Sequence, residues 1–296
     1  MAANTDTAIL DGAGKCWINF SEISDTLLKD LKADVFVNAR VKGPQELADV
    51  LSSLRRDTVA QPAIFVGAGT CGLGAGAGKT LAAVREFLEQ HNIKADVVEV
   101  GCNGMCSDEP IMDIQVPGRA RVSFSTVTAD KVPEVLDAVL LENRIPTELV
   151  LGQYRAGSAK PWDGIVNLDA HPFLASQVRV VLASSGIIDP GNIYEYIAHG
   201  GYGSIAKVLR TMTPDAVCDL IEKSGLRGRG GGGFPTGKKW KFARAAVADQ
   251  KYLICNADEG DPGAFMDRAV CESDPHRLLE GMLISPRHLP RRPPAA

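Results

Sequence analysis

The most informative stretch of this sequence is Ser224-Gly-Leu-Arg-Gly-Arg-Gly-Gly-Gly-Gly-Phe-Pro-Thr-Gly-Lys-Lys-Trp240. It holds six glycines from Gly228 to Gly237, and glycine lets the main chain take positive φ and lets a planar or anionic ligand come close. The residues after Pro235 predict a helix capped by Thr236. Free N–H groups at that helix start, with Lys239 one turn in, predict an anion site suited to a nucleotide phosphate.

A second stretch, Lys251-Tyr-Leu-Ile-Cys-Asn-Ala-Asp-Glu-Gly-Asp-Pro-Gly-Ala-Phe-Met-Asp-Arg268, follows closely. Its apolar run from Tyr252 to Cys255 predicts a buried strand. Asn256, Asp258 and Glu259 come at the carboxyl end of that strand, where open α/β sheets bind ligands, and could hold the hydroxyls of a ribityl or ribose chain. A loop and an acidic turn are each weak signals, but the two in tandem are more specific.

The pair of stretches resembles the flavin- and NADH-binding subunit of respiratory complex I and of related soluble hydrogenases and formate dehydrogenases. In that family the glycine loop packs on FMN and on the NADH that stacks against it. The resemblance implies FMN contacts from the loop and its helix, namely Gly228, Arg229, Gly230, Gly231 and Lys239, and NADH flanked by Phe234 and Phe242. It implies that Asn256, Asp258 and Glu259 hold the flavin and that Asp261 lies near NADH. Two departures are mild: Gly232 stands where the family often has alanine, and Asp261 where it often has glutamate.

The composition of the chain argues against several classes of protein, namely nucleic-acid-binding, membrane-spanning, secreted and disulfide-rich proteins. The chain of 296 residues has a net charge of −4, which argues against a nucleic-acid surface. No apolar run has membrane-spanning length, and the first residues are not those of a signal peptide. Seven irregularly spaced cysteines suit a reducing compartment better than a disulfide framework. We therefore expect a cytoplasmic protein with no nucleic-acid partner and no direct membrane insertion.

Strands and helices alternate before the glycine loop. The pattern predicts helices near 43–56, 79–91 and 130–141, and strands at 63–66, 96–100, 111–116 and 120–125. Cys71, Cys102 and Cys106 fall in loops at strand ends, with Gly104 inside the C-x₃-C pair and Glu109-Pro110 after it. These features resemble the thioredoxin-like [2Fe–2S] domain of the complex I family.

Such a cluster needs four thiolates. The family places two of them five positions apart in the first loop, but Val66 and Gly76 stand five positions either side of Cys71. Either a distant residue such as Cys16 completes the set, or the domain kept its fold and lost its cluster, which we favour. The remaining alternative is that the three cysteines are ordinary thiols of a structural adaptor.

Two nucleotide motifs in the first glycine loop are disfavoured. Gly67 to Gly72 fits G-x-G-x-x-G after a strand, but the next helix is predicted to start too late to meet a pyrophosphate. Gly78-Lys79-Thr80 resembles the end of a P-loop, but that pattern needs glycine where Leu73 stands.

The later part of the chain is predicted to start with a linker rich in proline and glycine. A strand at 178–182 and helices at 192–199, 204–211, from Pro214 with Thr213 as cap, and 275–284 follow. We expect Cys218 and Cys255 in the core and Cys271 in a helical stretch. The predicted division is an N-terminal extension (1–42), a thioredoxin-like domain (43–142), a linker and entry segment (143–177), a partial FMN/NADH-binding α/β domain (178–284) and a Pro/Arg-rich tail (285–296).

The resemblance also implies a later segment whose cysteines bind a [4Fe–4S] cluster, and those ligands are absent here, so we expect a truncated version of a longer protein. The functional hypothesis is an NADH dehydrogenase-type subunit that oxidises NADH through FMN and passes electrons to iron–sulfur partner subunits. No catalytic side chain is expected, because the chemistry belongs to the flavin. The alternative is a non-catalytic adaptor whose thioredoxin-like domain docks on partner subunits.

Overall fold

The computed structural model describes residues 8–10, 16–18, 44–155, 157, 159–248 and 251–285, with side chains from Ala48 onward. These residues form two compact units. The larger unit comprises Ala48–Gly201 and Ala257–Leu278, and the smaller comprises Met1–Leu47, Tyr202–Asn256 and Leu279–Ala296.

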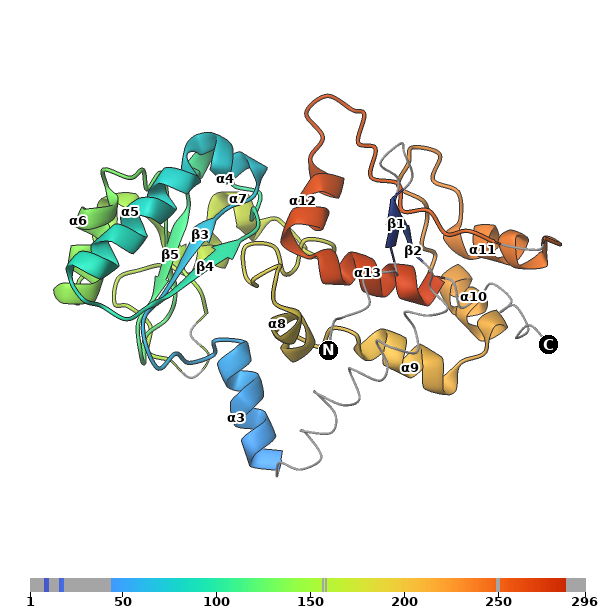
Figure 1. Cartoon of the computed structure of the whole chain (residues 1–296), viewed down its shortest axis with the longest axis horizontal. Coiled ribbons are helices and arrows are strands. Elements are labelled where there is room, and N and C mark those ends of the chain that lie inside the picture. Colours follow the sequence, from blue (N-terminus) through green and yellow to red (C-terminus); the bar gives the residue numbers. More distant parts are fainter. Residues whose placement is uncertain are drawn as a thin grey trace. The chain divides into compact units, whose positions relative to one another are not determined.

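The larger unit is built on a five-stranded sheet in the order β4-β3-β5-β6-β7 (Figure 1). Its strands are β3 (Ala63–Gly67), β4 (Asp96–Val100), β5 (Met112–Gln115), β6 (Val122–Phe124) and β7 (Val150–Gln153). β3 and β4 run parallel, and helix α5 (Ala77–Gln90) connects them, whereas every other neighbouring pair is antiparallel. A β-α-β unit followed by β-β-α is the order of a thioredoxin-like domain, and the expected α/β class is confirmed.

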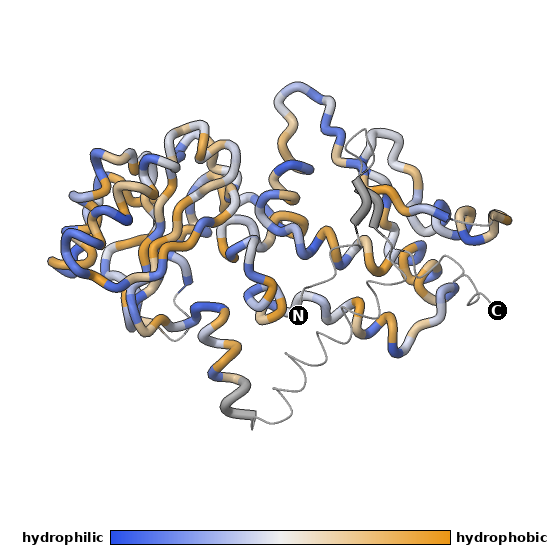
Figure 2. The backbone as a smooth tube through the Cα atoms, viewed as in Figure 1, coloured by the Kyte–Doolittle hydropathy of each residue, from blue (hydrophilic) through white to orange (hydrophobic). Residues whose placement is uncertain are grey.

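One face of this sheet carries the main core. Side chains at alternate positions of a strand share a face, so Ile64 and Val66 of β3 point to the same side. They pack with Ile114 of β5, Val84 of α5 and Leu136, all of which are almost completely buried. Leu136 belongs to α6 (Val132–Leu136), which continues as the π-helix η3 (Asp137–Leu141). In Figure 2 the strands of the sheet are strongly hydrophobic, as this packing requires.

The opposite face carries a smaller cluster with a buried ion pair. Phe65 and Val98 belong to this cluster, and the guanidinium carbon of Arg121 lies 3.6 Å from the centre of the Phe65 ring. Arg121 pairs with Asp113 at 2.6 Å and donates to the carbonyl oxygen of Gly186 at 2.7 Å. The buried guanidinium of Arg121 therefore has both an ionic and a hydrogen-bonding partner, and its bond to Gly186 holds that part of the chain against the sheet.

Several helices and strands predicted from the sequence are confirmed, and the structure adds others that were not predicted. Helix α3 (Pro44–Leu54) and helix α8 (Ile193–Ala198) are confirmed, as are α5 and strands β3 to β6. Helix α4 (Thr70–Ala75) and strand β7 occupy stretches expected to be a glycine loop and linker. Short helical turns complete the unit: η2 (Cys106–Asp108), η4 (Thr147–Leu149), η5 (Leu168–Ala170) and α7 (Pro172–Ala175). Helix α12 (Met266–Ser273) confirms the helical stretch around Cys271.

The strand expected at 178–182 is wrong. A strand needs a paired neighbour, and none of the described residues pairs with this stretch. Val178 is 90% exposed, whereas Arg179 turns inward and donates to the carbonyl oxygen of Asn103 at 2.8 Å. The apolar residues at 178–182 are typical of a strand, but this segment does not pair with the sheet.

The described residues of the smaller unit include a two-stranded antiparallel pair, β1 (Ala8–Leu10) with β2 (Cys16–Ile18), and helices α9 (Gly203–Thr211), α10 (Pro214–Lys223) and α11 (Thr236–Ala245). Thr213 caps α10 as expected, since its side chain accepts from the N–H of Ala216. Helix α13 (Pro275–Ile284) is confirmed, and Glu280 on it accepts hydrogen bonds from the N–H groups of Tyr202, Ser204 and Ile205 around the start of α9.

Three local predictions in the glycine-loop region are wrong. Thr236 does not cap α11: it is the first helical residue, and its N–H donates to the carbonyl oxygen of Leu226. The stretch from Tyr252 to Cys255 is not a strand, because no described residue pairs with it, and Ile254 is 73% exposed. Cys255 is accordingly exposed, whereas Cys218 is buried as expected. No helix among the described residues has the length and apolar character to cross a membrane.

Candidate functional sites

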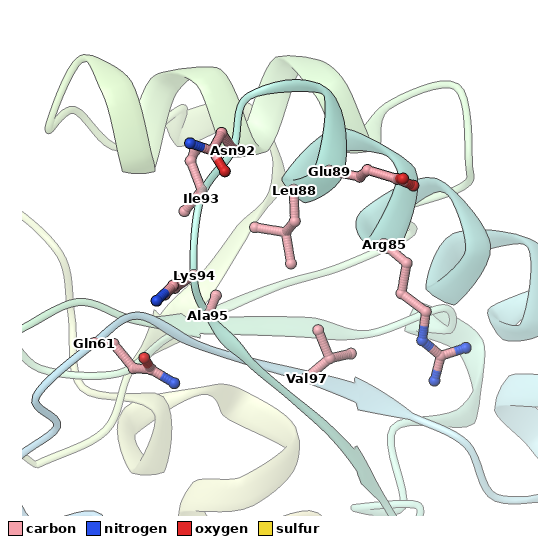
Figure 3. A pocket seen from close by; sticks show the side chains of 9 residues that line it. All are labelled: Gln61, Arg85, Leu88, Glu89, Asn92, Ile93, Lys94, Ala95 and Val97. Carbon is pink, nitrogen blue, oxygen red and sulfur yellow. The ribbon is translucent and has the colours of Figure 1, made fainter.

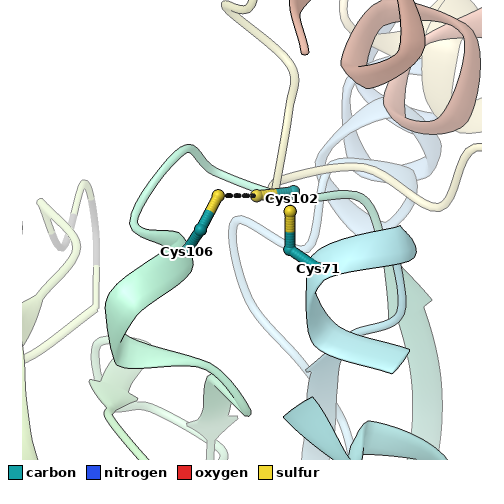
Figure 4. A group of neighbouring side chains, drawn as sticks. All are labelled: Cys71, Cys102 and Cys106. Carbon is teal, nitrogen blue, oxygen red and sulfur yellow. Dashed lines mark hydrogen bonds between the residues drawn. The ribbon is translucent and has the colours of Figure 1, made fainter. Parts of the chain in front are cut away.

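Three cysteine side chains meet at one end of the sheet of the larger unit (Figure 4). Cys71 lies on α4, directly after β3, and Cys102 follows β4. Because β3 and β4 are parallel, their carboxyl ends lie at the same edge, and the two following loops are neighbours. Cys106 begins the short helical turn η2 that comes next. The three sulfur atoms lie within 4.8 Å of one another, and those of Cys102 and Cys106 are 3.6 Å apart.

A tight turn shapes the segment between Cys102 and Cys106. Gly104 has a φ of +97°, which side-chain-bearing residues rarely adopt. Its N–H donates to the sulfur of Cys102 at 3.3 Å, and the Asn103 side chain accepts from the N–H of Met105 at 2.9 Å. The turn therefore holds both thiols on one side of the loop.

The thiols differ in exposure. Cys102 is buried, Cys71 is half-buried and Cys106 is exposed. Burial is the main cause that raises the pKa of each thiol above its usual value. Without a cation the three side chains are accordingly neutral thiols near neutral pH.

Helix α12 supports this end of the sheet with two charged side chains that the sequence did not single out. A guanidinium nitrogen of Arg268 lies 3.7 Å from the sulfur of Cys71. Glu272 accepts from the backbone N–H of Thr70 at 2.9 Å and from its hydroxyl, at the first residue of α4. In the sequence these two residues show only the four-residue spacing of an ion pair along a helix. That spacing does not predict that they contact Cys71 and Thr70.

The contact between Glu272 and Thr70 also argues against a dinucleotide site at Gly67 to Gly72, for a reason different from the one the sequence suggested. Helix α4 begins at Thr70, so the expectation that the helix starts too late was wrong. The carboxylate of Glu272 already occupies the N–H of Thr70 there. A second anion, such as a pyrophosphate, would meet that negative charge.

Within the described part of the chain, the three thiols lack the fourth ligand that a two-iron cluster needs. Among the described histidine, cysteine, aspartate and glutamate side chains, no fourth one joins the group. Val66 is completely buried within β3, and Gly76, with a φ of +111°, joins α4 to α5. Neither can supply a thiolate. The side chain of Cys16, the other residue considered for the set, lies outside the described residues.

The glycine loop of the smaller unit closes on itself. The N–H of Gly228 donates to the carbonyl oxygen of Phe234 at 2.9 Å, and the Arg227 guanidinium donates to the carbonyl oxygen of Gly233 at 2.6 Å. A Cβ placed on Gly230, Gly231 or Gly232 would find no heavy atom within 4 Å. The tip of the loop is therefore bare backbone beside open space, which is the surface that a planar ring can approach.

Charged and aromatic side chains flank this loop as expected. Arg229 and Lys239 are both exposed. The rings of Phe234 and Phe242 lie together, with their centres 6.3 Å apart, and they are 49% and 66% exposed. The structure thus brings together the two aromatic side chains that the resemblance assigns to one ligand.

The acidic residues that were expected to share the site are divided between the two units. Asn256 belongs to the smaller unit, and Asp258, Glu259 and Asp261 belong to the larger. Partial desolvation opposes the charged form of Glu259, but the backbone N–H groups of residues 266 to 268 outweigh it and lower the pKa of this carboxyl. Its carboxylate caps the start of α12, accepting from the N–H of Asp267 at 3.0 Å.

A shallow hollow of about 550 Å³ lies at the other end of the sheet, beside the last turn of α5 (Figure 3). Leu88 and Val97 form its floor, and Arg85 and Glu89 stand at its rim (Figure 3). The polar groups around it do not converge on a point, which is what a binding site for a small ligand needs.

Comparison with known proteins finds a family match over the segment that contains the glycine loop. Residues 221–291 match the Nuo51 FMN-binding domain. The chain is 60% identical over 108 residues to the HndC subunit of the NADP-reducing hydrogenase of Solidesulfovibrio fructosivorans, covering 36% of this chain and 22% of the relative. It is 49% identical over 106 residues to the F 2 subunit of the NADH-quinone oxidoreductase of Rhizobium meliloti, covering 36% and 25%. It is 30% identical over 213 residues to the alpha subunit of the NAD-reducing hydrogenase HoxS of Cupriavidus necator, covering 69% and 32%.

Two solved structures are similar in part. A thioredoxin-like [2Fe–2S] ferredoxin from Aquifex aeolicus aligns with a TM-score of 0.29 and 17% identity, covering 33% of this chain and 96% of that one. An NAD⁺-reducing [NiFe]-hydrogenase aligns with a TM-score of 0.30 and 23% identity, covering 91% and 42%.

The glycine loop lies inside the matched segment: residues 221–291 are similar to an FMN-binding domain. The chain is a homologue of the F subunits of NADH-quinone oxidoreductases and of subunits of NAD- and NADP-reducing hydrogenases. It spans between about a fifth and a third of the length of these relatives.

Proposed function

We propose that this chain acts as an electron-transfer flavoprotein subunit that oxidises NADH through FMN and delivers the electrons to iron–sulfur centres of partner subunits. The observation that carries the proposal is the match of residues 221–291 to an FMN-binding domain, over the same residues in which the loop leaves its backbone open. Three relatives named for NAD(H) or NADP reactions support the nicotinamide partner.

The chain's own residues contribute binding and orientation. The bare backbone of Gly230 and Gly231 fits the flat face of an isoalloxazine ring, and Phe234 with Phe242 offers aromatic surface for a nicotinamide. Arg229 and Lys239 supply positive charge for the phosphate and for a flavin that gains negative charge on reduction. When bound, FMN accepts a hydride from NADH and releases electrons singly, so no side-chain acid or base is required.

A flavin-binding experiment tests the proposal. The full chain, mixed with FMN and freed of excess, should retain flavin absorption, and NADH should bleach it. Gly230→Leu should abolish binding, because the side chain fills the space of the ring, whereas its Cβ would meet no heavy atom within 4 Å in the protein alone. Gly78→Leu is the matched control: Gly78 is exposed on α5 with equally open space around it, so this variant should bind FMN normally. A colourless wild-type protein that does not react with NADH would contradict the proposal.

The second candidate function is a non-catalytic adaptor. Large apolar side chains are exposed around the flavin segment, including Val247, Tyr252 and Ile254, at 103%, 62% and 73%. Exposed apolar surface of this kind is typical of a contact with another protein. In this case the chain would bind partner subunits while remaining colourless and inert toward NADH, so the experiment above distinguishes the two functions.

The compartment is part of the same proposal. None of the six cysteines whose side chains are described forms a disulfide bond, and thiols persist in the reducing cytoplasm. The proposed partners are NADH and iron–sulfur subunits of a multisubunit redox complex.

A further inference from the structure

The three thiols at the end of the sheet are arranged for one metal ion. Zinc holds thiolate sulfur at about 2.3 Å in a tetrahedron, which separates two sulfurs of one ion by about 3.8 Å. The sulfurs of Cys102 and Cys106 are 3.6 Å apart, and that of Cys71 lies within 4.8 Å of both. Small side-chain rotations therefore bring all three to one centre.

A two-iron cluster requires a different arrangement of ligands. It takes four thiolates, in two pairs on different irons, and the separation between the irons keeps the pairs apart. Of the six described thiols only three gather here, and all three are mutually close. Val66 and Gly76, which flank Cys71 at the spacing of a second ligand, offer no donor atom.

The surroundings suit a trithiolate centre with a single divalent cation. Three thiolates and one such cation leave a net charge of −1, and the Arg268 guanidinium, 3.7 Å from the sulfur of Cys71, balances it. The N–H of Gly104 donates to Cys102, which is the kind of contact that orients and tunes a metal-bound thiolate. Cys106 is exposed, so a cation has a path of entry and water can take the fourth position.

We propose that Cys71, Cys102 and Cys106 bind one thiophilic divalent cation, Zn²⁺ in the first place, with water as the fourth ligand. This site is independent of the flavin proposal. Cys71 comes from α4 and the other two ligands from one turn, so the ion would fix the relative positions of α4 and the Cys102–Cys106 turn.

Metal titration of the whole chain tests the site. The protein is prepared without oxygen, stripped with a chelator and titrated with Co²⁺, whose thiolate complexes absorb visibly. We expect tetrahedral Co²⁺ bands that saturate at one ion per chain and disappear when Zn²⁺ is added. Absence of these bands would overturn the proposal. So would two irons with two acid-labile sulfides per chain after reconstitution, or a Cys102–Cys106 disulfide that persists under reductant.

Variants identify the ligands. Cys106→Ser changes an exposed side chain and should leave the fold intact, as circular dichroism would show, yet weaken Co²⁺ binding at least 100-fold. Cys255→Ser, at another exposed cysteine outside the group, is the matched control and should bind as the wild type does. Arg268→Gln should keep one ion per chain but weaken binding about tenfold, as the loss of a group that contacts a metal ligand does. Unchanged affinity in Cys106→Ser would overturn the assignment.

Discussion

Glu109 is a buried carboxyl group with an unusual protonation equilibrium. Its side chain is only 6% exposed and accepts from the N–H of Ile111 at 2.7 Å. Burial raises its pKa to about 7, the Ile111 N–H opposes the rise, and the nearby carboxylates of Asp113 and Asp108 add to it. The folded protein therefore favours the protonated carboxyl across a range in which the unfolded chain is already ionised.

The sign of the pH dependence follows from this raised pKa. The stabilising contribution of protonated Glu109 is complete below pH 4.5 and is lost as pH rises through about 7, by at most about 3 kcal/mol. We expect the free energy of unfolding to fall between pH 5 and pH 8, and Glu109→Gln to remove that part of the slope. Urea unfolding at both pH values measures it. An unchanged slope in the variant would show that other groups cause the dependence.

At the scale of elements, the contact between α10 and α11 depends on one glycine. Gly237 is buried in the first turn of α11, and a Cβ there would overlap the backbone of Glu222 on α10. Across the same contact Lys241 pairs with Asp219 at 2.6 Å and with Glu222 at 2.5 Å. These ion pairs are partly exposed and contribute little, so the close backbone approach decides whether the helices dock.

We expect Gly237→Ala to lower the free energy of unfolding by about 2 kcal/mol, because a methyl group forces the two helices apart. Gly232→Ala is the control: its Cβ would have open space, and the change should stay within about 0.5 kcal/mol. Urea unfolding compares the two, followed by tryptophan fluorescence in a background where Trp17 and Trp162 are replaced by phenylalanine, so that Trp240 on α11 is the reporter. Equal stabilities would mean that α10 and α11 do not pack as described.

At the scale of the whole molecule, the two units differ in how their backbone is protected. The sheet of the larger unit has a core with Ile64, Phe124 and Val122 at no more than 1% exposure. In the smaller unit the stretch from Leu226 to Cys255 contains α11 but no strand among its described residues, and Phe242 and Ile254 are exposed. Buried, paired backbone opens rarely, whereas exposed backbone opens readily.

Hydrogen exchange measured by mass spectrometry should reflect this difference. We expect slow exchange in β3, β5 and β6 and exchange at least 100-fold faster in residues 226–235 and 251–256. Added FMN should slow exchange at the glycine loop and leave β5 unchanged. Slow exchange at residues 251–256 in the free protein would mean that this stretch is a paired strand after all.

Local patterns in the sequence were enough for the regular parts of this protein. Short runs of apolar residues predict β3 to β6, and the helical period predicts α3, α5 and α13, because each pattern is written in the residues of its own element. The glycine loop is recognisable for the same reason: its backbone freedom resides in the residues themselves. The loop lies within residues 221–291, the segment that matches an FMN-binding domain.

Tertiary structure alone decided what depends on residues far apart in the chain. The strands expected at 178–182 and 252–255 have the right composition, but a strand forms only where a neighbour pairs with it. The convergence of Cys71 with Cys102 and Cys106 comes from the parallel pairing of β3 and β4, and the contact of Arg268 with Cys71 spans 197 residues. No local period encodes such contacts, because their position depends on how the whole unit packs.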